Sequence, residues 1–147
     1  MILLDTDTYT LVVRRDSEEG LRVRARIAQV PPGELVATTI ITYHEQCKGW
    51  IDYVAGARGQ ADQVEAYGFL ANHLEAFGKA RVIPYNVAAA DKFEELRKTH
   101  RRAGTMDLRI AAIALTRRAL LVTRNLGHFS GIEGLRAEDW TRIQPLL

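Results

Sequence analysis

The sequence has little or none of what marks secreted and membrane proteins. Its single cysteine, Cys47, rules out an internal disulfide, as is usual for proteins of a reducing compartment. No apolar run approaches the roughly 18 residues that a helix needs to cross a bilayer. Residues 1–5 lack the basic segment of a signal peptide. We therefore expect a cytoplasmic protein with no membrane contact.

Several common catalytic motifs are also missing. The chain has no P-loop motif, no GxGxxG dinucleotide motif and no GxSxG nucleophile elbow, which excludes those three site types. Its histidines form neither an HExxH motif nor a Cys/His zinc pattern. They are His44, His73, His100 and His128. Any metal site is therefore expected to use oxygen ligands.

The composition is that of one globular domain covering residues 1–147, since 47% of the residues are hydrophobic and 26% are charged. The net charge is only +2, but basic side chains gather in the second half of the chain, at Lys98, Arg101, Arg102 and Arg109. Such a cluster is typical of a solvated helix face, and it also suits a phosphate polymer. The charge pattern alone leaves both readings open.

Short apolar runs alternate with helical patterns along the chain. The predicted strands are residues 2–4, 35–37, 81–84, 120–123 and 140–143. The predicted helices are residues 9–30 with a break near 14–20, a segment that begins after Thr38 or Thr39 and ends at Gly56–Gly59, then 61–77, 88–102 and 106–118. This alternation predicts an α/β fold with a mainly parallel sheet of about five strands flanked by helices.

Helical spacing also predicts which faces are buried. The helix after Thr39 carries an apolar stripe, and the next helix is expected to turn Val64, Tyr67, Leu70, Leu74 and Phe77 inward, so that the two form a hairpin. The stripe consists of Tyr43, Cys47, Trp50, Ile51 and Val54. The helix over 106–118 is apolar almost all round, which predicts a fully buried helix capped by Thr105.

Polar residues follow two of the predicted strands. Asp5 comes directly after the first strand and Asn125 comes just after the fourth, so both are expected at the carboxyl edge of the sheet, where ligands bind in such folds. Asp107 lies in the first turn of the buried helix. Each also has a structural explanation, because Asp5 suits a helix N-cap, Asp107 suits the helix dipole and Asn125 suits a turn.

Carboxylates without Cys or His partners favour hard cations such as Mg²⁺ or Mn²⁺. One or two such ions can activate water for attack on a phosphodiester. Glu45 is a further acid, but it lies opposite the apolar stripe of its helix, and the spacing therefore predicts that it is exposed.

Taken in order, four segments resemble the PIN-domain family, and specifically its VapC-type toxins. The resemblance covers nearly the whole chain, and its most specific segment is the one around Asp107. The segments are Leu3–Asp7, Ala37–Gln46, Gly104–Ala112 and Leu121–Phe129, followed by Gly134–Leu135 and Glu138–Trp140.

This resemblance implies a three-layer α/β/α fold in which Asp5, Glu45 and Asp107 bind a divalent ion, Mg²⁺ or Mn²⁺. Asn125 completes the catalytic set at a position where many members place a fourth acid. Thr6, Asp7 and Thr123 would support the ligands. Two residues depart from the family pattern: Asp7 replaces the usual Asn, which adds a charge, and Asn125 removes one.

The implied function is a Mg²⁺-dependent endoribonuclease, the toxin of a type II toxin–antitoxin system. The implied partners are a cognate antitoxin, a second copy in a homodimer, and tRNA or rRNA substrates. For RNA contact we expect Lys98, Arg101, Arg102, Arg109 and Arg124. Two alternatives stay open: a non-catalytic RNA- or protein-binding module, and a PIN nuclease of RNA maturation without an antitoxin.

Overall fold

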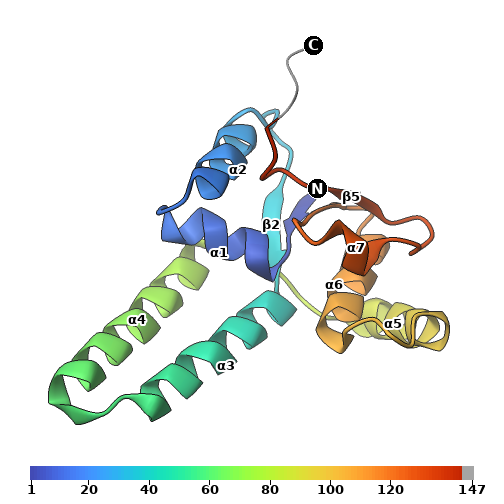
Figure 1. Ribbon diagram of the computed structural model, residues 1–147. Helices are drawn as coiled ribbons and strands as arrows, with labels where there is room; N and C mark the ends of the chain where they lie inside the picture. Colours follow the sequence, from blue (N-terminus) through green and yellow to red (C-terminus); the bar gives the residue numbers. More distant parts are fainter. Residues whose placement is uncertain (144–147) are drawn as a thin grey trace.

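A computed structural model describes residues 1–143, and residues 144–147 of the expected domain lie outside the described part. Its centre is a five-stranded sheet in the order β3-β2-β1-β4-β5 (Figure 1). Every neighbouring pair of strands is parallel. The strands are β1 (Ile2–Leu4), β2 (Val36–Thr39), β3 (Val82–Ile83), β4 (Leu120–Val122) and β5 (Arg136–Glu138). The predicted α/β class is confirmed.

Helices cover both faces of the sheet. They are α1 (Thr6–Arg14), α2 (Glu18–Ala28), α3 (Ile40–Gly56), α4 (Gly59–Lys79), α5 (Val87–Thr99), α6 (Thr105–Thr116) and α7 (Leu126–Phe129). Leu3 faces the core formed with α5 and α6, whereas Ile2 and Leu4 face the core formed with α1 and α2. Because successive residues of a strand point to opposite faces, this alternation produces the predicted three-layer architecture.

The buried helix is where the sequence placed it. Ile110 and Ile113 of α6 are 1% exposed, as the apolar pattern around the whole helix predicts. Its N-cap, however, is Gly104, and no side chain caps it, so the expectation of a Thr105 cap was wrong. Thr105 is instead the first helical residue.

The last strand is shifted from its predicted position. β5 covers Arg136–Glu138 rather than 140–143. Trp140, whose β-propensity suggested a strand, is buried just beyond it, where its ring lies under the Arg26 guanidinium at 4.6 Å and its Nε1 donates to Glu138. An aromatic residue that fills the core after a strand gives the same local signal as one within it.

Helices α3 and α4 form the predicted hairpin, which extends away from the sheet (Figure 1). The predicted inward face of α4 was largely wrong, because Val64 and Leu74 are 69% and 67% exposed. Phe77 is buried as predicted, and the other buried residues of α4 are Ala66 and His73. His73 and Phe77 pack against the Tyr43 ring of α3, with ring centroids 5.4 and 4.9 Å apart.

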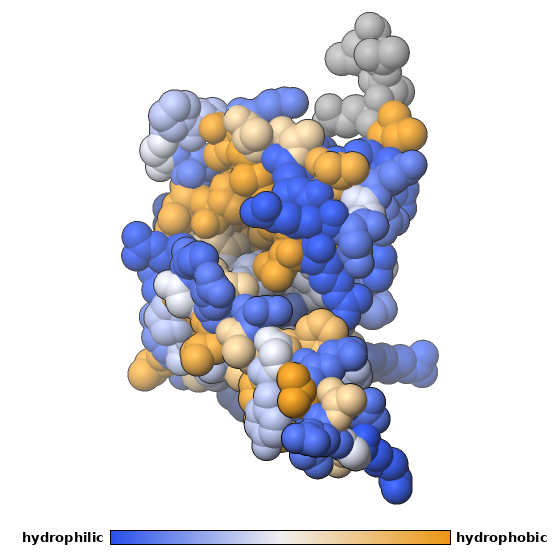
Figure 2. Space-filling model, turned by 90° about the vertical axis from the view of Figure 1, so that its left-hand side faces the viewer, coloured by the Kyte–Doolittle hydropathy of each residue, from blue (hydrophilic) through white to orange (hydrophobic). Residues whose placement is uncertain are grey.

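The outward side chains leave apolar surface on one side of the molecule. Figure 2 shows hydrophobic atoms reaching the surface on the side that carries α1, α2 and the hairpin. The exposed large hydrophobic residues of the hairpin include Ile51, Tyr53, Tyr67 and Phe69. Within residues 1–143, no helix is both long and apolar enough to cross a membrane.

Candidate active site

Asp5 lies where the sequence predicted, at the carboxyl edge of the sheet. Its backbone N–H donates to the Val122 carbonyl at 3.1 Å, which joins the ends of β1 and β4. Its side chain is also the N-cap of α1, because Oδ1 accepts from the Thr8 N–H at 2.8 Å. The edge position and the helix cap, which the sequence offered as alternatives, therefore occur together in one buried carboxylate.

Glu45 is half-buried and faces α1, contrary to the exposure that helical spacing predicts. Its Oε1 accepts from the Thr6 hydroxyl at 2.6 Å. The prediction failed because α3 has a second contact face, along which Thr42 lies against Thr6 and the Gln46 amide donates to the Thr10 hydroxyl. The resemblance assigned Glu45 to the site, and the structure places Glu45 on the side of α3 that faces α1.

Asp107 reaches the same edge from the first turn of α6. Its Oδ2 lies 3.0 Å from Nδ1 of His128, a residue of α7. Gly104 is close behind, since a Cβ there would lie 3.4 Å from the same oxygen. Nothing in the sequence indicated the contact with His128, because neither the short helix α7 nor its position beside α6 could be read from spacing.

A second group of polar residues follows β4. The Thr123 hydroxyl, which is fully buried, accepts from the Asn125 N–H at 3.0 Å. The Asn125 amide nitrogen donates to Asp7 Oδ2 at 2.8 Å. Arg124 bridges Asp7 and Glu19, at 3.6 and 3.2 Å. Thus all the supporting residues expected from the resemblance lie at this edge.

The acids at this edge influence one another electrostatically. Burial raises the pKa of Asp5, and hydrogen bonds from Thr123 and Thr8 only partly offset that effect. Burial also raises the pKa of Glu45, and the charges of Asp107, Asp7 and Asp5 raise it further. Carboxylates that repel each other in this way favour a nearby divalent cation, and a set made only of oxygens fits Mg²⁺ or Mn²⁺.

The carboxylates are nevertheless not arranged as a finished coordination sphere. Within the part of the chain that the structure describes, no three acidic, imidazole or thiol side chains lie close enough to hold one metal ion. Glu45 is held by Thr6, and Asp107 by His128. Binding a shared ion would require these two side chains to exchange those hydrogen bonds for the metal.

These shifts predict how stability depends on pH in the absence of metal. The pKa values of Asp5 and Glu45 are raised on folding, so their protonated forms stabilise the folded protein. Their contribution to the free energy of unfolding is complete below the unfolded-state pKa of about 4 and is lost as pH rises through the folded-state pKa values. In EDTA, the urea midpoint of Glu45→Gln should therefore fall less between pH 4.5 and pH 8 than that of the unmodified protein. Parallel curves for the two proteins would show that Glu45 is not perturbed.

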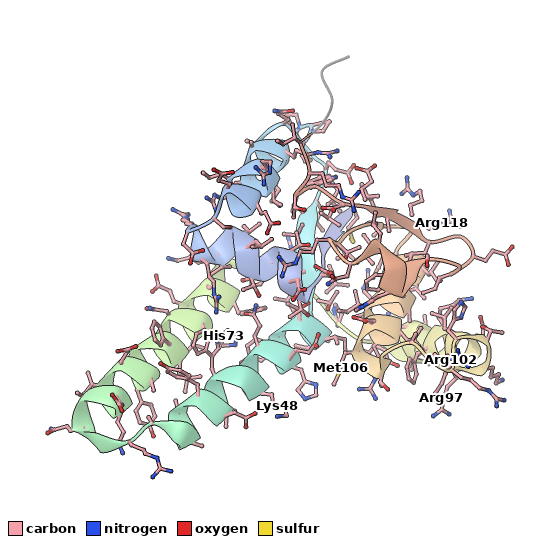
Figure 3. The ribbon with its side chains drawn as sticks, in the orientation of Figure 1. Lys48, His73, Arg97, Arg102, Met106 and Arg118 are labelled. Atoms are coloured by element: carbon pink, nitrogen blue, oxygen red, sulfur yellow. The ribbon has the colours of Figure 1, made fainter. Side chains whose placement is uncertain are left out.

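The predicted basic cluster divides into separate groups. Lys98, Arg101 and Arg102 line an open groove of about 960 Å³ that also contains Asp107 and His128. Figure 3 shows Arg102 beside α5, away from the hairpin that carries His73. This groove leads from the end of α5 to the acidic edge.

The other two arginines lie elsewhere. Arg109 is half-buried, and its guanidinium packs over the Phe93 ring at 5.3 Å and the Tyr85 ring at 6.0 Å. Arg124 pairs with Asp7 of α1 and Glu19 of α2. The sequence grouped Arg109 with the basic residues that line the groove, because it is close to them along the chain. On α6, however, its side chain points toward Phe93 of α5.

Comparison with known proteins agrees with this architecture. The chain is 28% identical to Ribonuclease VapC1 of Haemophilus influenzae strain R2866 over 122 residues, which cover 82% of this chain and 85% of that protein. The structure of VapBC-1 from nontypeable Haemophilus influenzae superposes with a TM-score of 0.70 and 26% identity, covering 97% of this chain and 100% of the other. No family model matches the chain.

A more distant structure shows the same fold: FitAcB from Neisseria gonorrhoeae has a TM-score of 0.70 at 24% identity, over 97% of this chain and 100% of the other. The parallel sheet between two helical layers is the PIN-like three-layer fold that these structures share. Within that class, the chain is similar to Ribonuclease VapC1 and to the VapBC-1 structure.

Proposed function

We propose that this chain is a Mg²⁺- or Mn²⁺-dependent endoribonuclease that acts as the toxin of a type II toxin–antitoxin system, with residues 1–147 as its single nuclease domain. The observation that carries the proposal is the gathering of three acids at the carboxyl edge of the sheet: Asp5 directly after β1, Glu45 of α3 and Asp107 of α6. The charges of Asp5 and Asp107 raise the pKa of Glu45, which agrees with this position. The similarity to a protein named Ribonuclease VapC1 supports the choice of RNA as substrate.

In this proposal, Asp5, Glu45 and Asp107 hold the divalent ion. When bound, the ion supplies an activated water and stabilises the charge that develops on the phosphate. Asp5 is kept in place by the Thr8 N–H and by Thr123, so that it is oriented before any ligand arrives. The chain's own cations would bind the substrate backbone on the side of Asp107.

The groove yields a prediction about salt. Changing Lys98, Arg101 and Arg102 to glutamine should weaken RNA binding and lower the slope of log affinity against log salt by about 0.7 for each phosphate that is no longer neutralised. Fluorescence anisotropy with a labelled RNA in Ca²⁺, across a salt series, measures both quantities.

The matched control removes the same charge elsewhere, with Arg58, Arg81 and Arg117 changed to glutamine. These exposed residues lie at the hairpin turn and at the amino edge of the sheet. An equal fall in slope in both triple variants would mean that RNA is attracted by overall charge and not by the groove.

A cognate antitoxin and a second copy of the chain are the proposed protein partners, and the cytoplasm is the proposed location. The similar structure of VapBC-1 supports the antitoxin. The apolar side chains that the hairpin leaves exposed support a protein partner of some kind, because surface of this type is usually covered.

The function is tested by incubating the purified protein with total RNA, with Mg²⁺, with Mn²⁺ and with EDTA, and mapping the new ends. The proposal requires cleavage at defined tRNA or rRNA positions that EDTA abolishes. RNA binding without cleavage under any metal would indicate the non-catalytic module instead. Cleavage by a protein whose gene has no small neighbouring antitoxin gene would indicate RNA maturation.

A further inference from the structure

His128 leaves one hydrogen-bonding nitrogen free in the basic groove beside Asp107. Its Nδ1 lies 3.0 Å from Asp107 Oδ2, and an ionised carboxylate can only accept, so this nitrogen carries a proton and donates. Within residues 1–143, Nε2 has no hydrogen-bond partner, and the side chain is 63% exposed. Nε2 also stays available if Asp107 exchanges this bond for a metal ion. The ring therefore presents an unused polar atom to the groove.

The other uncharged polar side chains of the groove are already bonded within the protein. His100 uses both ring nitrogens, because Nε2 lies 3.2 Å from the Gly131 carbonyl and Nδ1 lies 2.9 Å from the Thr99 hydroxyl. The Ser130 hydroxyl donates to the Gly127 carbonyl at 3.0 Å. These contacts tie the groove's two walls and its rim to the protein itself.

The cations of the groove, Lys98, Arg101 and Arg102, suit phosphate but carry no information about the sugar. All three are exposed, and the phosphates that they would bind are the same in RNA and DNA. The ribose 2′-OH distinguishes the two polymers, and it can both donate and accept a hydrogen bond. Hydrolysis by an activated water does not consume that hydroxyl. A preference for RNA therefore requires a contact with the sugar in addition to those with phosphate.

The free nitrogen of His128 meets that requirement in position and in chemistry. It belongs to the residue that contacts Asp107, so a nucleotide that follows the groove to the acidic edge passes beside this ring. A neutral imidazole accepts a hydrogen bond from the hydroxyl at Nε2, and a protonated imidazole donates one to the hydroxyl oxygen. The contact therefore forms in either protonation state of the ring.

We propose that His128 is a specificity-determining residue that selects RNA over DNA, because its Nε2 hydrogen-bonds the ribose 2′-OH of the nucleotide bound beside Asp107. This inference rests on the nuclease function proposed above. It assigns separate tasks to the groove: the cations attract the phosphate backbone of any nucleic acid, and the histidine recognises the sugar.

The first experiment measures the binding of labelled RNA, and of DNA with the same sequence, by fluorescence anisotropy in Ca²⁺. The informative variant is His128→Asn, because its short amide can still donate to Asp107 but does not extend to the position of Nε2. It should bind RNA about 2- to 10-fold more weakly, the range expected for one hydrogen bond, and bind DNA as before. The matched control is His44→Asn, at an exposed histidine of α3 outside the groove, and it should change neither affinity.

The second experiment locates the contact on the substrate. Each nucleotide around the mapped cleavage site is replaced singly by its 2′-deoxy form, and the affinity is measured for the unmodified protein and for His128→Asn. One replacement should weaken binding to the unmodified protein by about 2- to 10-fold. The same replacement should have no effect on binding to His128→Asn, because the two changes remove the same hydrogen bond.

Three results would overturn the inference. They are equal affinity of the unmodified protein for RNA and DNA, a fall in affinity in folded His128→Asn that is as large for DNA as for RNA, and a 2′-deoxy scan that is the same for both proteins. Circular dichroism checks that each variant is folded. Failure of the proposed function looks different, because the unmodified protein would then cut no RNA with any metal, whatever its affinity for RNA.

Discussion

Replacing Asp5 by asparagine is expected to reduce metal-dependent RNA cleavage by at least about a hundredfold, because a bound ion supplies several kcal/mol of transition-state stabilisation. The fold should survive, since asparagine is as good an N-cap as aspartate and can still accept from the Thr8 N–H. Single-turnover cleavage of a mapped RNA site measures the reduction, and near-UV circular dichroism checks the fold.

The matched control is Asp62→Asn, which removes an exposed acid from the first turn of α4. It should cut RNA at the normal rate. In EDTA, Asp5→Asn should be at least as stable as the unmodified protein, because the substitution removes a carboxylate whose pKa is raised by burial. Full activity in folded Asp5→Asn would refute the proposed catalytic role.

Gly20→Ala is expected to destabilise the protein by about 1–3 kcal/mol, the usual cost of forcing an extra carbon into a packed contact. Gly20 is buried in α2, and a Cβ there would collide with the Leu11 carbonyl oxygen of α1. Since that oxygen belongs to the backbone, one of the two helices must move. Urea denaturation gives the change in the free energy of unfolding.

Gly68→Ala provides the opposite result in the same experiment. Gly68 lies inside α4, and a Cβ there would meet no atom within 4 Å. Alanine should therefore stabilise the protein by about 0.5–1 kcal/mol, because a helix favours it over glycine. If both glycine variants shift stability in the same direction, the close approach of α1 and α2 is not what determines the effect at Gly20.

The parts of the fold that the sequence predicted are those with a single strong pattern. The apolar run ending at Asp5 could only be a buried strand, and the sequence from Leu108 to Leu115 could only be a buried helix. Because the strands are parallel, the end of β1 and the end of β4 had to meet at one edge. Asp5 and Asn125, which follow these two strands, were therefore expected at the same edge.

The rest depends on contacts between elements, which spacing does not encode. Glu45 lies on a face of α3 that is half-buried only because α1 packs against it. The buried face of α4 is the one that carries His73 and Phe77, whose rings pack against Tyr43 of α3, whereas Val64 and Leu74 are exposed. The pairing of Asp107 with His128 likewise depends on where α7 lies beside α6.

The two outer strands are very short, with two residues in β3 and three in β5. Each edge therefore presents few free backbone groups to another chain. Growth of the sheet by an added strand is correspondingly unfavourable, so association should proceed through helix surfaces and their side chains. A partner peptide should then bind without increasing the β-sheet signal in the infrared amide I band.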